Sequence, residues 1–305
     1  MQILNLIIPI FILILLGYVL KEKKFLSKKS ADDINKLVYY IALPALLFNA
    51  ISSFSFETVF SFKLILNFYI ATIVLVILAL LISIPIKRAI RGALVMCSFR
   101  GNLAYLGLPV VSFAFGEMAG AIAAIIIGFA IPLYVTLSVI LLLIYSKTKT
   151  KINIKILIKD IILNPLIIGI ALGLIFSIFN LSLPVILDES IKLIARISLP
   201  LILIIIGFTI SLKEIKKYIK LDLLTSILKL IILPAIGMLI FRFLFSIPFE
   251  NAKVAVLMLA MPTAVASFSF AKELKADEKY TASQIGFSTI ASLITISIFI
   301  MILGG

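Results

Sequence analysis

Long apolar runs separated by short polar segments make up almost the whole chain. Several of these runs reach about 18 residues, the length that a helix needs to cross the hydrocarbon core of a bilayer. The pattern predicts an all-α membrane protein with ten transmembrane helices. We place these helices at residues 3–20, 31–53, 62–86, 91–115, 119–145, 154–179, 187–210, 219–245, 251–271 and 280–303.

The first apolar run begins at Ile3 with no basic residue before it. A signal peptide carries its positive charges ahead of the apolar core. Here Lys21, Lys23 and Lys24 follow the run instead. We therefore expect a retained first helix whose N-terminus lies outside.

The composition adds information mainly through the number and position of charged residues. The 305 residues are 63% hydrophobic and 14% charged, with a mean hydropathy of +1.28. The net charge of +14 would indicate a nucleic-acid partner in a soluble protein. Here the basic residues lie in short loops between predicted spans, as the positive-inside rule expects. We therefore predict a bilayer as the partner and no nucleic acid.

The basic residues alternate from one connection to the next. The odd-numbered connections hold Lys21, Lys23, Lys24, Lys28 and Lys29, then Lys87, Arg88 and Arg91, then Lys147, Lys149, Lys151, Lys155 and Lys159, then Lys213, Lys216, Lys217 and Lys220, then Lys272, Lys275 and Lys279. The even-numbered connections hold almost none. This alternation predicts a multi-pass protein of the cell membrane with its N-terminus and C-terminus outside.

The second half of the chain repeats the first after a shift of 156 residues. Under this shift Pro9, Gly17, Asp32, Lys36 and Pro44 fall on Pro165, Gly173, Asp188, Lys192 and Pro200. Five predicted helices separate the copies, so the copies run through the membrane in opposite directions. We therefore predict two inverted five-helix repeats, residues 1–150 and 151–305, an architecture of many secondary transporters. A duplication retained only for packing is the alternative.

Two predicted helices contain residues that interrupt a helix. These residues are Gly101, Asn102, Gly107 and Pro109 in the fourth helix and Pro262 in the ninth. Leu103, Thr263 and Val265 lie beside them and are predicted to bind substrate. Proline removes a backbone donor and clashes with the preceding turn. A broken membrane helix turns free N–H groups and a positive half-helix end toward a cavity, which suits an anion. We expect paired breaks that bind substrate, and a simple kink at each proline is the alternative.

Three basic residues lie deeper than the loops: Arg100, Arg196 and Lys229. A charged side chain at the centre of a membrane helix costs roughly 2.5–3.5 kcal/mol on insertion scales, so it needs a partner or a wet cavity. All 14 acidic residues are expected in loops or near helix ends. We therefore predict that a transported anion supplies negative charge beside Arg196 or Arg100. Snorkelling toward head groups is the alternative, most of all for Lys229.

The chain contains few residues of the types that catalyse reactions or bind metals. Cys97 is the single cysteine and there is no histidine, which excludes a disulfide framework and removes the commonest metal ligand. We predict no catalytic residue, no metal and no cofactor, and do not expect an enzyme. Coupling stays open, because a uniport or potential-driven mechanism fits at least as well as proton symport, and sodium could bind carbonyls and hydroxyls at the breaks.

Three motifs resemble the auxin efflux carrier family, within the superfamily of bile-acid, arsenite and riboflavin transporters. The segment Leu43–Phe48 resembles its Val-Pro-Leu-Leu segment, and Asn102–Pro109 resembles its Asn-Thr-x-x-x-Gly-x-Pro crossing. The segment Pro262–Glu273, which ends in Phe-Ala-Lys-Glu, is similar to its ninth-helix motif. This last match is the most specific, because it runs through a polar loop. The resemblance covers essentially the whole chain.

The resemblance implies a scaffold of helices 1, 2, 6 and 7, often paired as a homodimer, and a transport domain of helices 3–5 and 8–10 that moves like an elevator. It implies that Leu43, Asn102, Ala104 and Val265 line a carboxylate site near the crossing. Plant carriers have an asparagine where Arg196 stands here. This departure argues against auxin and for a more highly charged acid, such as a dicarboxylate. The plant carriers' long cytosolic loop is missing, so phosphorylation of that loop is not expected here.

These inferences predict a secondary transporter of auxin efflux carrier type that moves a small organic anion by elevator-like alternating access. Asn102 would donate to the carboxylate, Arg196 or Arg100 would compensate its charge, and Pro109 and Pro262 would maintain the breaks. One alternative is a sodium-coupled organic anion symporter of bile-acid-transporter type, which a sodium gradient would drive. A membrane enzyme and a channel or structural subunit are further alternatives.

Overall fold

A computed structural model describes residues 2–145, 154–244 and 247–304, and the regular structure within these ranges is helical. Internal contacts divide the chain into two compact units. Unit 1 comprises Met1–Ser61, Ala104–Ile131 and Ile158–Phe208, and unit 2 comprises Phe62–Leu103, Pro132–Leu157 and Thr209–Gly305. The units are interleaved along the chain. The predicted repeats, residues 1–150 and 151–305, are a different division that stays a prediction.

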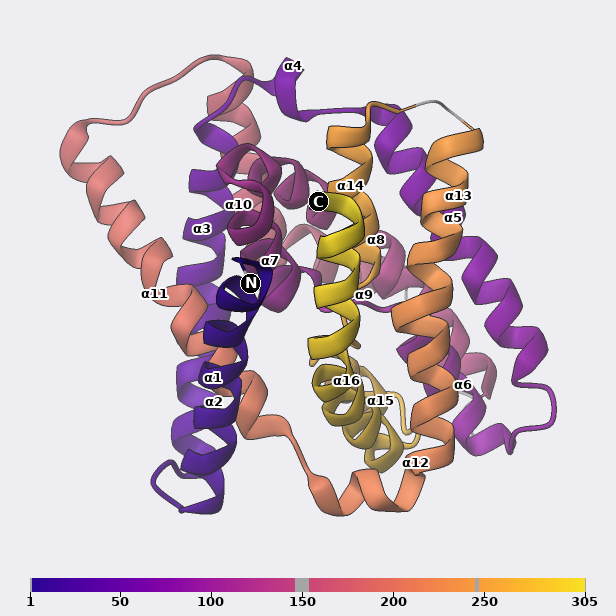
Figure 1. The fold of residues 1–305 in the computed structure, drawn as a ribbon. Coiled ribbons are helices and arrows are strands. Elements are labelled where there is room, and N and C mark those ends of the chain that lie inside the picture. Colours follow the sequence, from indigo (N-terminus) through magenta and orange to yellow (C-terminus); the bar gives the residue numbers. More distant parts are fainter. Residues whose placement is uncertain (1, 146–153, 245–246, 305) are drawn as a thin grey trace. The chain divides into compact units, whose positions relative to one another are not determined.

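Unit 1 is built from helices of both halves of the sequence. It contains α1 (Gln2–Glu22), α2 (Lys28–Leu37), α3 (Leu43–Ser52), α4 (Phe56–Val59), α7 (Leu108–Phe115), the first part of α8 (Glu117–Tyr145), most of α9 (Ile154–Ile162), α10 (Pro165–Ile178) and α11 (Val185–Thr209) as far as Phe208. Helix α3 packs along α10, and α1 packs against α7 (Figure 1).

Helices α1 and α11 approach each other closely through two glycines. A Cβ atom on Gly17 would lie 1.9 Å from the carbonyl oxygen of Ile204, and one on Gly207 would lie 1.8 Å from that of Ile14. Both distances are far below van der Waals contact, so any side chain at either position would force the two backbones apart. Small residues at such contacts are how membrane helices pack closely without a hydrophobic driving force.

Unit 2 holds the interrupted helices. It contains α5 (Phe62–Ile82), α6 (Arg88–Phe99), the last part of α8, α12 (Leu212–Ile227), α13 (Leu233–Phe243), α14 (Phe249–Leu259), α15 (Ser267–Glu273) and α16 (Glu278–Gly304). Helix α12 packs along α16, and α5 packs against α6 and α13. The side of α16 toward these neighbours carries buried hydroxyl groups, among them those of Thr281, Ser283 and Ser288. The core of unit 2 is therefore partly polar.

Three short π-helical segments each precede a Leu-Pro pair. They are η1 (Val38–Ala42) before Leu43-Pro44, η2 (Leu103–Gly107) before Leu108-Pro109, and η3 (Leu228–Ile232) before Leu233-Pro234. Proline has no N–H group to donate, and its ring clashes with the carbonyl four residues earlier. A widened turn relieves that clash while keeping the helix continuous. Each π segment thus has a local cause in the sequence.

Six described helical stretches are long and apolar enough to cross a membrane: Lys28–Ser52, Phe56–Ile82, Glu117–Tyr145, Val185–Thr209, Leu212–Phe243 and Glu278–Gly304. Shorter apolar helices cover Leu103–Phe115 and Pro165–Ile178. The fourth and ninth predicted spans fall short because their helices end at Phe99 and Leu259. The count of ten spans and their inverted repeat stay predictions.

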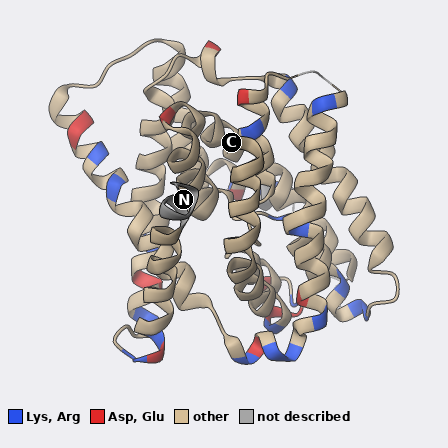
Figure 2. Ribbon diagram, viewed as in Figure 1, with Lys and Arg blue, Asp and Glu red and all other residues tan. Residues whose placement is uncertain are grey.

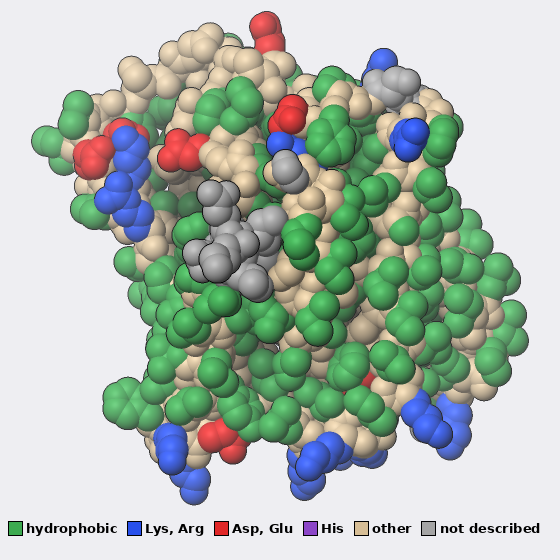
Figure 3. All heavy atoms as spheres, in the orientation of Figure 1, with side chains coloured by type: hydrophobic (Ala, Val, Ile, Leu, Met, Phe, Trp, Pro, Cys, Tyr) green, Lys and Arg blue, Asp and Glu red, His purple; other side chains and the backbone are tan. Residues whose placement is uncertain are grey.

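The surface of unit 2 fits a membrane environment. Hydrophobic side chains cover the visible side of α13, and basic side chains lie near its C-terminal end, whose last turn holds Arg242 (Figure 3). Lysine and arginine gather at the end of the unit where α6 and α12 begin and α15 ends (Figure 2). This is the end that holds Lys213, Lys216, Lys272 and Lys275, which the sequence places in the basic connections.

Candidate functional site

The breaks of two helices meet in unit 2. Helix α6 ends at Phe99 and α14 ends at Leu259, and an extended segment follows each of them. The segments run antiparallel and exchange two backbone hydrogen bonds. The N–H of Asn102 donates to the carbonyl of Pro262 (2.7 Å), and the N–H of Ala264 donates to that of Arg100 (2.9 Å). The two breaks therefore form one joined structure, which we call the crossing.

Thr263 closes the end of α6. Its hydroxyl donates to the carbonyl of Cys97 (3.0 Å), one of the last-turn carbonyls that a helix cannot satisfy itself. The N–H of Thr263 donates to Ser288 Oγ (3.1 Å) of α16. Pro262, immediately before, has no N–H group to continue α14. The break in one helix thus supplies the C-terminal cap of the other.

The N–H groups at the crossing are less available than the sequence predicted. We expected freed N–H groups to point into a cavity, but those of Asn102, Thr263 and Ala264 all donate within unit 2. The expectation is wrong for these three groups because the two breaks satisfy each other. A substrate would therefore have to use other donors.

The side-chain amide of Asn102 offers such a donor. Asn102 is only 4% exposed, and its Nδ2 atom is buried with no hydrogen-bond partner among the described residues. An unpaired buried amide donor costs free energy comparable to a lost hydrogen bond. The crossing therefore presents an unsatisfied donor on the residue that the sequence predicted to bind a carboxylate.

Arg100 is buried beside the crossing and held by α8 and α15. Its Nη1 donates to the carbonyl of Tyr134 (3.2 Å) and to Ser138 Oγ (3.0 Å). Its guanidinium group also lies 4.2 Å from the centre of the Phe270 ring. These contacts fix the guanidinium group of Arg100 in place beside the crossing.

Lys229 lies in the π segment η3 and is fully buried. Its Nζ donates to the carbonyl of Leu259 (2.7 Å), at the C-terminal end of α14. The snorkelling interpretation of Lys229 is therefore wrong, because its ammonium group points into the core of unit 2. No salt bridge to Lys229 occurs in the ranges that the structure describes.

The expectation that all acidic residues lie in loops or near helix ends is wrong for Asp222. It lies inside α12 with a fully buried side chain, rather than in a loop or near a helix end. Ser283 Oγ donates to its Oδ2 (2.5 Å), and the amide of Gln284, suitably oriented, donates to its Oδ1 (3.2 Å). The packing of α12 along α16 thus gives this carboxylate two donors. It forms no salt bridge with Lys229.

The other predicted site residues divide between the units. Leu103 and Val265 lie in unit 2 with Arg100, Gly101, Asn102, Pro262 and Thr263, whereas Leu43, Ala104, Arg196, Gly107 and Pro109 lie in unit 1. Leu43 is buried at the start of α3, and Arg196 is exposed on α11. Gly107 closes η2, and Pro109 lies in the first turn of α7. The extended backbone in the fourth predicted helix is at Arg100–Asn102, which precedes both Gly107 and Pro109 in the chain.

Comparison with known proteins agrees with this architecture. The family model described as "Membrane transport protein" matches residues 2–300. The chain belongs to this membrane transport protein family. The match confirms the family that the three sequence motifs indicated, and it covers both halves of the chain and both helix breaks.

Curated relatives of this transporter are similar along their whole length. An uncharacterized transporter of Methanocaldococcus jannaschii is 29% identical, with 97% of each chain covered. An uncharacterized transporter of Methanothermobacter thermautotrophicus is 26% identical, again with 97% of each chain covered. A Rhizobium meliloti protein named "Putative malonate transporter" is 24% identical, covering 97% of this chain and 94% of the relative.

The sequence analysis missed several residues around the buried charges of this transporter. Tyr134 and Ser138, which hold Arg100, are four residues apart on α8 and so share one helix face. That spacing was visible in the sequence, but nothing in it indicated that Arg100 would be the partner. Phe270 and Ser288 gave no signal of their own, because aromatic and hydroxyl residues are common throughout this chain.

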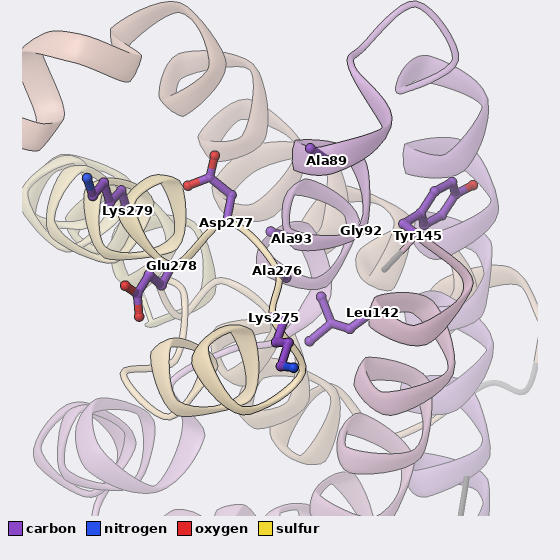
Figure 4. A pocket seen from close by; sticks show the side chains of 10 residues that line it. All are labelled: Ala89, Gly92, Ala93, Leu142, Tyr145, Lys275, Ala276, Asp277, Glu278 and Lys279. Atoms are coloured by element: carbon purple, nitrogen blue, oxygen red, sulfur yellow. The ribbon is translucent and has the colours of Figure 1, made fainter. Parts of the chain in front are cut away.

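A separate cavity of about 310 Å³ lies at the basic end of unit 2. Residues of α6, of α8 and of the loop before α16 line it, including Gly92, Leu142, Tyr145 and Lys275. The side chains of Glu278 and Lys279 point away from the α6 and α8 residues (Figure 4). None of the predicted site residues lines this cavity. It is therefore distinct from the crossing, and no group of metal-ligating side chains occurs among the described residues.

Proposed function

We propose that this transporter carries a small dicarboxylate, bound at the crossing of unit 2, by alternating access. The observation that carries the proposal is the buried and unpaired Nδ2 of Asn102. A carboxylate oxygen would accept from this donor and remove the cost of leaving it unsatisfied. Substrate sites at discontinuous helices are the rule in carriers of this architecture.

Positive charge beside the crossing supports an anionic substrate. Arg100 and Lys229 are buried cations of the same unit as Asn102, and Lys229 forms no salt bridge within the described ranges. A charge buried without a counter-ion is costly in a membrane. Arg196 remains a predicted contact, and the name of the Rhizobium relative supports malonate as the first acid to test. A dianion would offset more of this charge than a monoanion.

Two repeat-related contacts support the inverted repeat. A Cβ on Gly17 would lie 1.9 Å from Ile204 O, and a Cβ on Gly173 would lie 3.1 Å from Phe48 O. The shift of 156 residues that converts Gly17 into Gly173 also converts Phe48 into Ile204. Two halves related by a twofold axis in the membrane plane require such reciprocal contacts.

The division into two units supports an elevator-like movement in part. Helices 1, 2, 6 and 7 of the predicted scaffold correspond to elements of unit 1, and helices 3 and 8–10 of the transport domain correspond to unit 2. Helices 4 and 5 are divided between the units instead of belonging to the second. A homodimer through the scaffold helices and termini outside the cell membrane complete the proposal.

The test is flux into proteoliposomes that contain the purified protein and internal unlabelled acid. We expect saturable counterflow of malonate, weaker counterflow of monocarboxylates, and loss of malonate flux in Asn102→Ala. A hydrogen bond to a charged group contributes about 1.5–3 kcal/mol, which corresponds to a rise of about tenfold or more in KM. Asn251→Ala, at the start of α14 and outside the crossing, is the matched control. Absence of counterflow for every acid, or an unchanged KM in Asn102→Ala, would overturn the proposal.

A further inference from the structure

A carboxylate is buried within a membrane-crossing stretch of unit 2. Asp222 lies in α12 with a fully buried side chain, two residues after the exposed Lys220. Ser283 Oγ donates to its Oδ2 (2.5 Å), and the amide of Gln284, suitably oriented, donates to its Oδ1 (3.2 Å). Among the described residues no salt bridge to Asp222 occurs. An ionisable side chain inside a membrane is costly, and in transporters such residues serve as proton carriers.

The two partners of Asp222 suit both of its protonation states. A carboxylate only accepts hydrogen bonds, whereas a carboxylic acid also donates one. The hydroxyl group of Ser283 can donate or accept. The side-chain amide of Gln284 carries both a donor and an acceptor, and it is linked in turn to Ser226 Oγ (3.0 Å). Rotation of these neighbours can therefore satisfy either form of Asp222, whereas a salt bridge would favour the ionised form alone.

The titratable groups that face Asp222 from neighbouring helices are ordinarily neutral. Tyr280 of α16 and Cys97 of α6 each interact electrostatically with Asp222, and both helices pack against α12. Tyrosine and cysteine side chains are ordinarily uncharged at pH 7. Asp277 precedes Tyr280 by one turn and accepts from its N–H (2.9 Å), and Lys229 lies two turns beyond Asp222, where its amine bonds to α14. The charge of this cluster is therefore set by whether Asp222 holds a proton.

Asp222 lies between the basic end of unit 2 and the crossing. On the basic side, Lys220 is exposed two residues before it. On the other side, Ser288 Oγ accepts from the N–H of Thr263, and Ser288 lies five residues beyond Ser283 on α16, about 7.5 Å along the helix axis. A dianion at the crossing would repel an ionised Asp222 through a protein interior, where charges interact more strongly than in water. Binding of the anion and binding of a proton then favour each other, and this coupling is reciprocal.

We propose that Asp222 is a proton-binding site that couples this carrier to the proton gradient, with one proton carried alongside each dianion. The proposal rests on the proposed dicarboxylate transport and adds a coupling ion to it. Arg100 and Lys229 carry two positive charges, which the two charges of a dianion offset. An ionised Asp222 would leave the loaded unit with a net buried charge, and a proton on Asp222 removes that charge.

Asp222→Asn separates coupling from transport. The amide has the shape of the protonated acid and cannot release a proton, so exchange of internal for external acid should continue. Net uptake driven by a pH gradient should be lost, because no proton accompanies the substrate. If Asp222 only ties α12 to α16, Asp222→Asn instead keeps gradient-driven uptake. Glu250→Gln, at an exposed acid in the first turn of α14, is the matched control.

The experiment is malonate flux in proteoliposomes with acid outside and the membrane potential clamped at zero by valinomycin and equal potassium. We expect the wild type and Glu250→Gln to accumulate malonate about tenfold for each unit of pH gradient, and an internal pH dye should report matching proton entry. Asp222→Asn should show counterflow but no accumulation above that of protein-free liposomes. Wild-type counterflow without accumulation, accumulation by Asp222→Asn, or loss of counterflow in folded Asp222→Asn overturns the proposal.

Infrared spectroscopy of the purified protein tests the proton site without substrate. Titration of the wild type should show the C=O band of a buried carboxylic acid, which Asp222→Asn lacks and Glu250→Gln retains. If Asp222→Asn does not fold, Ser283→Ala, which removes a hydrogen bond to the carboxyl group, should shift the band. A wild type without this band at any pH at which it stays folded, or a band that neither variant alters, overturns the proposal. A protein that gives no counterflow for any acid contradicts the carrier function instead, and the infrared titration still decides the proton site.

Discussion

At the scale of single residues, the two buried cations of unit 2 differ in how they are held. Arg100 has its guanidinium fixed by Tyr134, Ser138 and the ring of Phe270, whereas Lys229 donates to one carbonyl. Arginine presents several donors in a rigid plane and keeps its charge in any environment. Arg100 therefore keeps its charge and is held by several contacts, whereas Lys229 is a compact cation held by one carbonyl.

This difference predicts how Arg100 sets substrate charge. Arg100→Met keeps an apolar stem and removes the positive charge, so it should weaken binding of a dianion about twice as much, in free energy, as that of a monoanion. The measurement is the ratio of KM values for malonate and a monocarboxylate in counterflow. Arg242→Met, on the exposed end of α13, should leave the ratio unchanged. An equal rise in both KM values would contradict a charge-compensating role.

The hydroxyl group of Thr263 is expected to stabilise the crossing. Thr263→Val retains the shape of the side chain and removes the hydroxyl that donates to the Cys97 carbonyl. A lost buried hydrogen bond costs about 1–3 kcal/mol when its partner stays buried. We expect a lower Tm than for Thr295→Val, because Thr295 Oγ1 is buried and has no hydrogen-bond partner among the described residues. Equal Tm values in the two variants would show that Thr263 does not stabilise the break.

At the scale of secondary-structure elements, backbone contact decides which helices pair in unit 1. Gly17 and Gly207 let α1 and α11 meet backbone to backbone, and Gly173 does the same for α10 and α3. Residues with side chains would separate these helices by the width of at least a methyl group. A few glycines thus determine which helices from opposite halves of the chain can pack together in unit 1.

Gly207→Ala should destabilise unit 1 severely. The added Cβ would lie 1.8 Å from Ile14 O, a backbone atom that cannot move without displacing α1. Overpacking of a well-packed site costs about 1–3 kcal/mol, occasionally more, and the variant should show a clearly lower Tm and folded yield. Gly128→Ala is the control, because its Cβ would meet only the side chain of Ile170, at 3.1 Å. A Gly207→Ala protein as stable as the control would refute the close approach of α1 and α11.

At the scale of the whole molecule, charge in the loops predicts orientation. The basic connections are expected on the cytoplasmic side and the termini outside. Within unit 2, the lysines at the start of α12 and the end of α15 gather at one end, as this orientation requires (Figure 2). The predicted orientation therefore depends on loop composition and not on packing.

Cysteine labelling checks the orientation directly. Cys97 is buried, so Cys97→Ala provides a background in which single new cysteines report their side of the membrane. We expect an impermeant maleimide to label Ser182→Cys, in the loop before α11, in intact cells. Lys23→Cys should react only after permeabilisation. Labelling of Lys23→Cys in intact cells would reverse the predicted topology.

Local features of this protein could be determined from the sequence alone. The apolar runs, the membrane-protein class and the family all followed from composition, periodicity and motifs. The helix breaks were expected at the fourth and ninth spans, because proline and glycine act on the backbone of their own segment. The sequence did not predict that the backbone would be extended at Arg100–Asn102. Glycine permits a helix break but does not specify the residue at which the break begins.

Only the tertiary structure decided the partners of the polar groups. The sequence placed Arg100, Lys229 and Asn102 inside predicted spans, but any carbonyl, hydroxyl or ring within reach could have satisfied the two cations. The packing of α12 on α16 buried Asp222, and the joining of the two breaks left Nδ2 of Asn102 without an acceptor in the part of the chain that the structure describes. Hydrophobicity is a property of each residue, whereas hydrogen-bond partners are set by the arrangement of helices far apart in the chain.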